Sequence, residues 1–305
     1  MTAHIFGGPD TATKLHCLRS YLQAFSIALK EKNFTSVYID AFAGSGSRTE
    51  VRAGLPILGP GFPETEEITT PGSAKIAIDI KPPLSSIILI EQDPIRFAQL
   101  EALKQETADA RIQLYHGDAN NYVEQLCAMT HWRGPMAKGN GTRGVIFLDP
   151  YGMEVSWTTV QAIANTEALD CWYFFPLSGL YRNAPRDPKK LDAGKEAILD
   201  RVLGSTDWRE RWYPKVVSRK DMFEEETEAV RRVDVDAIET YVKERLESVF
   251  KGVVLDPIRL HHRHGPPLAS LFFAVSNPSP KAVGLAKNIA NHILNSGRSS
   301  QRRPR

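Results

Sequence analysis

An α/β fold with a largely parallel sheet is predicted for this 305-residue chain by two features. Short apolar runs alternate with helical stretches along residues 1–182, which is the pattern of βαβ units. Four of these runs end at or near an acidic residue, namely Asp40, Glu91, Asp118 and Asp149. The carboxyl ends of parallel strands lie along one edge of a sheet, where ligands bind. The sequence therefore predicts a ligand site at that edge.

The totals are those of a soluble globular protein, with 42% hydrophobic and 24% charged residues. The net charge of +2 does not demand a nucleic-acid partner, so any such partner must meet a local basic patch. No apolar run reaches the roughly 18 residues of a membrane span, and the N-terminus lacks the pattern of a signal peptide. Cys17, Cys127 and Cys171 are scattered, which indicates reduced thiols and a cytoplasmic protein without a membrane partner.

The first strand and the turn after it form the centre of the predicted site. A helix over 11–32, capped by Thr11 or Thr13, leads into a buried strand over 37–39 that ends at Asp40. Gly44 and Gly46 follow in a G-x-G turn, which is either an ordinary tight turn or a nucleoside site. A long Gly- and Pro-rich insert over 48–71 is expected to be irregular and to act as a lid or to be disordered.

The remaining elements of the first 182 residues alternate regularly. Helices are predicted over 73–80, 94–107, 121–131 and 157–165, and strands over 85–90, 111–115, 144–148 and 171–175. Ser73 is the expected cap of the first of these helices.

Residues 183–250 interrupt the alternation and are predicted to form a helical insertion or cap, with helices over 193–203 and 234–250. Part of it is basic, through Arg209, Arg211, Lys215, Arg219 and Lys220, and is either a mixed solvated surface or a patch that faces the substrate.

Residues 251–297 complete the core with a hairpin of strands over 253–262 and 268–276 and a helix over 279–294, before a basic tail over 298–305. The residues His261, His262 and His264 lie close together in the hairpin, but no further ligand pattern accompanies them. No metal site is therefore predicted.

The nucleoside that fits best carries no phosphate. A pyrophosphate needs a helix directly behind the glycine turn, and the insert separates the two. S-adenosylmethionine fits better, because Glu91 can accept hydrogen bonds from both ribose hydroxyls and Asp118 can accept one from the adenine amino group. Asp40 and the backbone of Gly44 and Gly46 suit the methionine part of that molecule.

The same motifs resemble a known family. Asp40-Ala-Phe-Ala-Gly-Ser-Gly46, then Ile90-Glu-Gln-Asp93, Gly117-Asp-Ala119 and Phe147-Leu-Asp-Pro-Tyr-Gly152 are similar to the motifs of class I S-adenosylmethionine-dependent methyltransferases, and more narrowly to the three-Cys-motif partner (TcmP) family. The resemblance implies a Rossmann-like sheet with an antiparallel C-terminal hairpin, and a partner protein that carries the three-Cys motif. The cofactor-binding residues that it implies are Asp40, Phe42, Gly44, Gly46, Glu91, Gln92, Asp118, Ala119 and Asp149.

The stretch from Asp149 to Gly152 is similar to the Asp/Asn-Pro-Pro-Tyr/Phe signature of methyltransferases that act on amino groups of nucleic acid bases. Asp149, Pro150 and Tyr151 are the catalytic residues that this implies, and Lys14, Arg48 and Tyr151 are expected to bind the substrate. The second proline of the signature is missing.

Three functions follow from these patterns. The first is a methyltransferase, and the second is a non-catalytic methyltransferase-like subunit that acts with a partner protein. The third is a nicotinamide oxidoreductase, which the displaced phosphate-binding helix disfavours.

Overall fold

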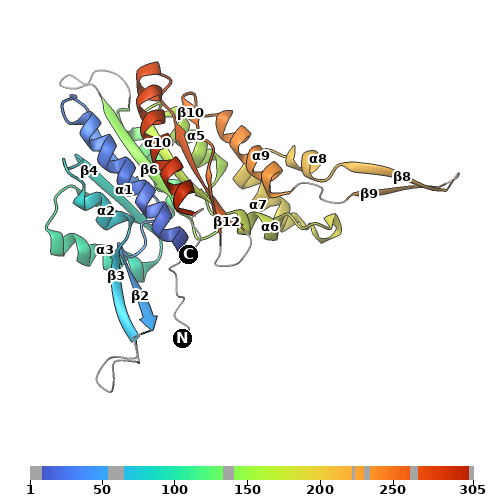
Figure 1. Cartoon of the computed structure of the whole chain (residues 1–305), viewed down its shortest axis with the longest axis horizontal. Helices are drawn as coiled ribbons and strands as arrows, with labels where there is room; N and C mark the ends of the chain where they lie inside the picture. The colour runs from blue at the N-terminus through green and yellow to red at the C-terminus, as the bar shows by residue number, and fades with distance from the viewer. Residues whose placement is uncertain are drawn as a thin grey trace.

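A single mixed sheet forms the centre of the computed structural model, which describes residues 9–53, 65–132, 141–221, 224–229, 234–261 and 267–301. The parallel strands are β1(Thr35–Asp40), β4(Ser86–Glu91), β5(Ile112–His116), β6(Thr142–Leu148) and β7(Leu169–Phe175). They lie in the order β5-β4-β1-β6-β7, and helices cover both faces of the sheet (Figure 1).

The last strands run the other way. The strand β12(Pro267–Val275) pairs antiparallel with β7, and β10(Val253–Val254) and β11(Ile258–His261) pair antiparallel with β12. This is a mostly parallel, Rossmann-like sheet with antiparallel C-terminal strands, so the predicted α/β fold class is confirmed. The strand order reverses between β1 and β6, which is the point where ligands bind in such sheets.

Alternation along each strand builds two separate cores. In β1, Val37 and Ile39 pack on one face, and Tyr38 packs on the other. Successive side chains of a strand point to opposite faces, so a central strand needs apolar residues at every position. The burial of β1 and β4 follows this rule, since the last five residues of each strand are buried.

The helices divide between these two cores. On one face lie α1(Pro9–Leu29), α2(Ser73–Asp79), α3(Pro94–Thr107) and α10(Pro280–Gln301). On the other face lie α4(Ala119–Met129) and α5(Trp157–Asn165). The predicted helices over 94–107, 157–165 and 193–203 match the structure to the residue, and the others differ at their ends by a few residues. The exception is α10, which continues seven residues beyond the predicted end at 294.

Two expected helix caps are wrong. The helix α1 begins at Pro9, so Thr11 and Thr13 lie inside it. The helix α2 is capped by Gly72 without a side-chain bond, because Ser73 already has helical geometry. The residue before Ser73 is a glycine that approaches Gly46 closely, with its N–H donating to the Gly46 carbonyl at 3.1 Å.

The insert over 48–71 is not irregular at its ends. The strands β2(Ser47–Ala53) and β3(Thr65–Pro71) pair antiparallel along their whole length and project from the body (Figure 1). The Gly- and Pro-rich part from 54 to 64 lies outside the described residues. The prediction was wrong because cross-strand pairing, and not the composition of either strand alone, stabilises a hairpin.

Residues after β7 form a helical layer: α6(Leu177–Asn183), the short 3₁₀ helix η2(Pro188–Lys190), α7(Ala193–Leu203), α8(Trp208–Trp212) and α9(Val235–Glu247). Trp208 and Trp212 are buried in it, and the Trp212 ring packs edge-on against Tyr241 at 5.2 Å. A ribbon of β8(Lys215–Asp221) and β9(Glu224–Ala229), which the helical prediction missed, projects from this layer (Figure 1).

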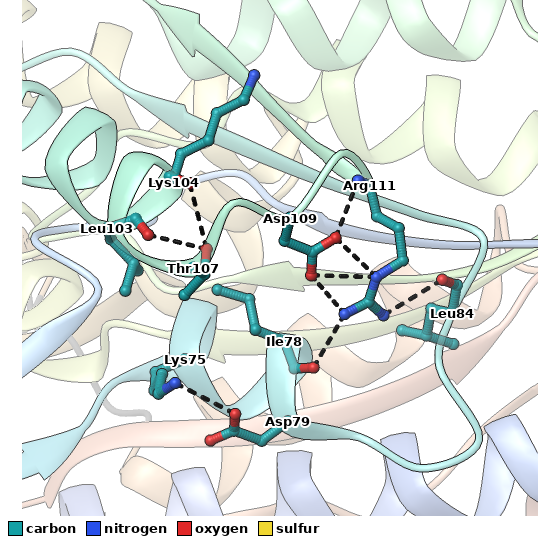
Figure 2. A network of polar contacts seen from close by, with 9 residues as sticks. All are labelled: Lys75, Ile78, Asp79, Leu84, Leu103, Lys104, Thr107, Asp109 and Arg111. Atoms are coloured by element: carbon teal, nitrogen blue, oxygen red, sulfur yellow. Dashed lines mark hydrogen bonds and ion pairs between the residues drawn. The ribbon is translucent and has the colours of Figure 1, made fainter.

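A polar clamp ties the outer edge of the sheet to α2. The Arg111 guanidinium pairs with Asp109 at 2.5 Å and donates to the carbonyls of Ile78 and Leu84 at 3.1 and 3.4 Å (Figure 2). Its side chain therefore joins the start of β5 to the end of α2 and the start of β4.

Within the described residues, no helix is long and apolar enough to cross a membrane.

Gly204 provides a test of packing at the helical layer. It ends α7 with a φ of +62°, and a Cβ there would lie 2.0 Å from the Trp157 ring. We expect Gly204→Ala to lower the free energy of unfolding by about 2–4 kcal/mol, through strain and overpacking together. Urea denaturation measures the change.

Gly284→Ala is the matched control, because Gly284 lies inside α10 and a Cβ there meets nothing within 4 Å. That change should leave stability equal or raise it by about 0.5–1 kcal/mol, since alanine favours a helix interior. Equal effects of the two substitutions would contradict the packing described.

Candidate functional site

The four acidic residues predicted from the strand ends do lie at the carboxyl edge of the parallel strands. Asp40 is the last residue of β1, and Glu91 is the last residue of β4. Asp149 directly follows β6, and Asp118 follows β5 after one intervening residue. The edge is therefore acidic, and the question is which partners these carboxylates have.

The two glycines of the turn after β1 have different roles. Both have a positive φ, +62° at Gly44 and +77° at Gly46. A Cβ on Gly46 would lie 2.7 Å from Leu103, so this glycine lets α3 pack against the turn. A Cβ on Gly44 would meet only the Tyr151 hydroxyl, at 4.0 Å. The space left open by a missing side chain therefore lies at Gly44, facing Tyr151.

Glu91 is the most connected residue of the site. Its side chain is 3% exposed. The Gly44 N–H donates to Oε2 at 2.9 Å, and the Asp93 N–H donates to Oε1 at 2.8 Å. The Arg96 guanidinium, from the first turn of α3, lies 3.1 Å from the same Oε1. This carboxylate thus joins the turn after β1 to the start of α3.

Arg96 also covers Tyr151. Its guanidinium lies 4.3 Å from the centre of the Tyr151 ring, a cation–π contact. Burial raises the pKa of the Tyr151 hydroxyl, although the ring is 54% exposed; Arg96 opposes the shift, while the charges of Glu91 and Asp149 add to it. Tyr151 therefore offers an aromatic surface beside a cation and two carboxylates.

Asp149 is paired with Lys14 of α1. The Lys14 ammonium lies 2.7 and 2.6 Å from the two carboxylate oxygens, and 4.5 Å from the centre of the Phe174 ring. Both partners are largely shielded, with side chains 13% and 21% exposed. The ammonium can therefore fix the orientation of the Asp149 carboxylate. The residues are 135 positions apart, so the pair is a product of the tertiary fold.

Asp40 is fully buried, so it does not present an open carboxylate. Its Oδ2 accepts from the Tyr38 hydroxyl at 3.0 Å, and its Oδ1 has no hydrogen-bond partner among the described residues. Burial raises the pKa of Asp40 to about 7, opposed by the nearby hydroxyls of Ser73 and Tyr38 and supported by the charge of Asp149.

The remaining predicted site residues are placed as follows. Asp118 caps α4 by accepting from the Asn121 N–H at 2.9 Å, and Ala119 behind it is buried. Gln92 is exposed, Phe42 is half-buried and Pro150 is buried. Arg48 lies in β2 opposite Thr70, and its side chain is outside the described part of the structure.

Two residues that the sequence did not single out fix the loop that carries Tyr151. Arg201 of α7 donates to the Met153 carbonyl and, at 2.9 Å, to the Glu154 carbonyl. Asn120 of α4 donates to the same Glu154 carbonyl at 3.1 Å and accepts from the Ser156 N–H at 2.8 Å. Asn120 comes two residues after Asp118, and Arg96 comes five residues after Glu91. Proximity to a strand end is therefore the sequence signal that could have identified Asn120 and Arg96. Arg201 has no such signal.

Two cavities among the described residues lie away from this edge. One, of about 450 Å³, lies between α4 and α5 beside Cys127 and His131. The other, of about 510 Å³, lies beside α3 and Leu114. Among the described residues, no three His, Cys, Asp or Glu side chains form a group that could hold a metal ion. His261 is exposed, and His262 and His264 lie outside the described residues.

No family model matches the chain, and no curated protein matches it. Solved structures give distant likenesses. A Legionella pneumophila protein assigned to the family model DUF519 is 15% identical, with a TM-score of 0.49 over 95% of this chain and 94% of that chain. The M. jannaschii TYW2 in complex with AdoMet is 10% identical, with a TM-score of 0.34 over 89% and 77%. An S-adenosylmethionine-dependent methyltransferase from Clostridium acetobutylicum is 10% identical, with a TM-score of 0.34 over 85% and 92%. These likenesses are too distant to identify a reaction or a substrate.

The buried Asp40 predicts a pH dependence of stability. Its pKa is 3.8 as a free carboxyl and about 7 in the fold, so between these values the folded protein holds a proton that the unfolded chain has lost. Stability from this group is complete below the unfolded pKa and falls as the pH rises toward the folded one. We expect Asp40→Asn to become more stable relative to the wild type by about 2–4 kcal/mol between about pH 4 and about pH 8.

Urea denaturation at the two pH values measures this difference. Asp79→Asn serves as the control, because Asp79 is exposed and pairs with Lys75 at the surface. Its stability should change in parallel with the wild type. Parallel curves for Asp40→Asn as well would show that Asp40 ionises normally in the fold.

Proposed function

We propose that this protein is an S-adenosylmethionine-dependent methyltransferase that acts on an amino group of a nucleic acid base. The observation that carries the proposal is the bond from the Gly44 N–H, in the turn after β1, to the buried Glu91 carboxylate at the end of β4. It places an open glycine, a carboxylate and an aromatic ring together at the ligand-binding edge of a class I methyltransferase sheet.

The residues present fit the adenosine part of the cofactor, with one condition. A carboxylate has about four acceptor positions, and three of those of Glu91 are used by Gly44, Asp93 and Arg96. Two ribose hydroxyls therefore need Arg96 to leave Glu91. Its ring contact with Tyr151 is also at the surface, where such contacts contribute only about 0.5–1 kcal/mol, so the displacement is feasible.

The other predicted cofactor contacts fit less directly. Asp118 uses one oxygen to cap α4, which leaves the other oxygen for the adenine amino group. Asp40 is covered by Tyr38, so a role for it toward the methionine part requires its unpartnered Oδ1 to face that group. Gly44, Glu91 and Asp118 are therefore the residues on which cofactor binding depends most.

The acceptor side consists of Asp149, Pro150 and Tyr151. The cofactor supplies an electrophilic methyl group bonded to a sulfonium. An amino group that donates a hydrogen bond to Asp149 would be oriented for attack, and a flat base could stack on the exposed Tyr151 ring. With the cofactor bound, Asp149 would hold the attacking amino group in line with the methyl group, and Asp149 or solvent would accept the proton that the nitrogen releases.

Lys14 would act on Asp149 in this scheme. Its ammonium holds both carboxylate oxygens and so fixes their direction. Most of the rate effect in such a reaction comes from aligning two reactants, which supplies up to about 7–11 kcal/mol in well-oriented systems. A well-oriented hydrogen-bond acceptor therefore contributes more to the rate here than a strong base would.

A second function is favoured by the bond between Arg96 and Glu91. A chain that never exchanged this ion pair for a ribose would be a non-catalytic subunit, and a three-Cys-motif protein would be its expected partner. Transfer of labelled methyl from S-adenosylmethionine to DNA or RNA by the purified chain alone would exclude it.

Calorimetry tests the cofactor site directly. We expect the wild type to bind S-adenosylmethionine and not NAD. The substitution Glu91→Ala should weaken binding by about 10–100-fold, because it removes charge-assisted hydrogen bonds in a buried site. Glu106→Ala, an exposed position of α3, should bind as the wild type does. Equal affinity of the Glu91→Ala protein would remove the proposed ribose contact.

Arg96→Met tests the competition at Glu91. If Arg96 must leave before the ribose binds, the variant should bind S-adenosylmethionine several-fold more tightly than the wild type, with a faster association rate. A large loss of affinity would instead show that Arg96 contacts the cofactor or is needed to hold Glu91. Stopped-flow fluorescence gives both rate constants.

Lys14→Met tests the acceptor side, with Lys30→Met at the exposed far end of α1 as its control. We expect the turnover of a methyl-accepting oligonucleotide to fall by about 10–100-fold, the cost of losing a charged hydrogen-bond partner. Affinity for S-adenosylmethionine should be unchanged. A fall in cofactor affinity without a change in turnover would show that Lys14 acts on the cofactor and not on the methyl acceptor.

A further inference from the structure

Four cations gather in one short stretch that follows the carboxyl edge of the sheet. The stretch over 182–190, here called the basic segment, runs from the last turn of α6 through η2. It carries Arg182, Arg186, Lys189 and Lys190, and all four are exposed. None of them has an ion pair with another described residue. The only acid in the segment, Asp187, uses its side chain to accept from the Lys189 N–H at 3.0 Å.

The charge of this segment outweighs that of the whole chain. Four cations and one acid give it a net charge of +3, whereas the full sequence has +2. The rest of the protein is therefore slightly acidic. Such a concentration of unpaired positive charge attracts an anionic partner locally, although the bulk charge does not.

The basic part of the helical region, which the sequence left as either a solvated surface or a patch that faces the substrate, is used differently. Arg209 lies 2.7 Å from Asp200 and 3.1 Å from Glu196. Arg211 lies 2.7 Å from Glu244 and 3.1 Å from Asp207. Both are neutralised within the helical layer and have little charge to offer a ligand. The remaining three cations of that group lie in β8, whose side chains are outside the described part of the structure.

The backbone of the basic segment is held in place. Ala184 is fully buried, and the Tyr213 hydroxyl donates to the Pro185 carbonyl at 2.6 Å. These contacts fix the middle of the segment to the helical layer while the charged side chains extend into solvent. A cationic surface that is already ordered loses less entropy when it binds than a mobile tail does.

The segment is also connected to the acceptor side of the site. The loop that carries Tyr151 packs on α6, since a Cβ on Gly179 would lie 3.0 Å from Met153. Arg182 lies three residues beyond Gly179, about one helical turn along α6. A chain whose base reached Tyr151 would therefore have its next phosphates near the basic segment.

We propose that the basic segment binds the phosphates of a single-stranded nucleic acid, whose base reaches the Asp149–Tyr151 side of the site. The proposal rests on the proposed function for the identity of the base site, but not for phosphate binding itself. A single strand is favoured because a base must be unstacked and unpaired before an amino group can reach a pocket at the sheet edge. Either DNA or RNA supplies this backbone.

Fluorescence anisotropy with labelled oligouridine and oligothymidine tests the surface. The triple variant Arg186→Ala, Lys189→Ala, Lys190→Ala should bind both probes about tenfold more weakly than the wild type. The slope of log K against log salt should fall by about 2, which is about 0.7 for each of three lost phosphate contacts on a single strand. The probe that the wild type binds more tightly identifies DNA or RNA as the source.

The control variant is Lys30→Ala, Lys32→Ala, Lys281→Ala. These cations are exposed, like those of the basic segment, but they precede β1 or follow β12 and so lie at the opposite edge of the sheet. Their removal changes the net charge by the same amount and should leave affinity and salt slope nearly unchanged. Circular dichroism confirms that both variants fold.

Several results would overturn the proposal: equal binding by wild type and basic-segment variant, an equal loss in the control variant, or binding to anionic vesicles without binding to either oligonucleotide. Calorimetry with S-adenosylmethionine on the same proteins separates the two claims. If oligonucleotide binding depends on the basic segment while S-adenosylmethionine does not bind, the methyltransferase proposal fails. The proposal that the basic segment binds phosphates is then still supported. If cofactor binds and oligonucleotides do not, only the surface fails.

Discussion

The buried carboxylate of Glu91 is the interaction on which the geometry of the site depends. It accepts from the turn after β1 through Gly44, from the start of α3 through Asp93, and from the Arg96 guanidinium. A carboxylate with 3% of its side chain exposed would be costly to bury without such partners. Arg96 in turn covers Tyr151, so one charge fixes the relative positions of three segments that are distant in the sequence.

The negative charges of three carboxyl groups at the carboxyl edge are accommodated in three different ways. Asp149 is neutralised by Lys14 from α1, and Glu91 is neutralised by Arg96 from α3. Asp40 has no ion pair with a described cation, and burial raises its pKa to about 7. The three carboxyl groups therefore differ: Asp149 is fixed by an ammonium, Glu91 is fixed by a guanidinium, and Asp40 has a pKa raised to about 7. Perturbed acids at a sheet edge are common at functional sites, although structural networks also produce them.

The helical layer after β7 connects to the site and is not a separate attachment. Arg201 of α7 donates to two carbonyls of the loop behind Tyr151, and Met153 of that loop packs against α6. The same layer neutralises its own arginines through Asp200 and Glu244, whereas the cations of the basic segment have no ion pair with any residue that the structure describes. The loop that carries Tyr151 and the basic segment are thus both supported by one packed unit around Trp208 and Trp212. This arrangement gives a physical reason for the layer to lie at the carboxyl edge.

The sequence by itself determined the sheet, because strand residues buried on both faces read as apolar runs and four of these runs end at or near an acidic residue. It therefore predicted the edge to which Asp40, Glu91, Asp118 and Asp149 come, and the glycine turn beside it. It could not determine the partner of each acid. Lys14 meets Asp149 across 135 positions, and Arg201 meets Glu154 across 47, through the packing of helices on different faces. The sequence also could not show which arginines are neutralised, since an ion pair depends on a distance of a few ångströms that no local pattern encodes. The tertiary structure alone decided that Arg209 and Arg211 are paired internally, and that the cations of the basic segment have no such pair within the described part of the chain.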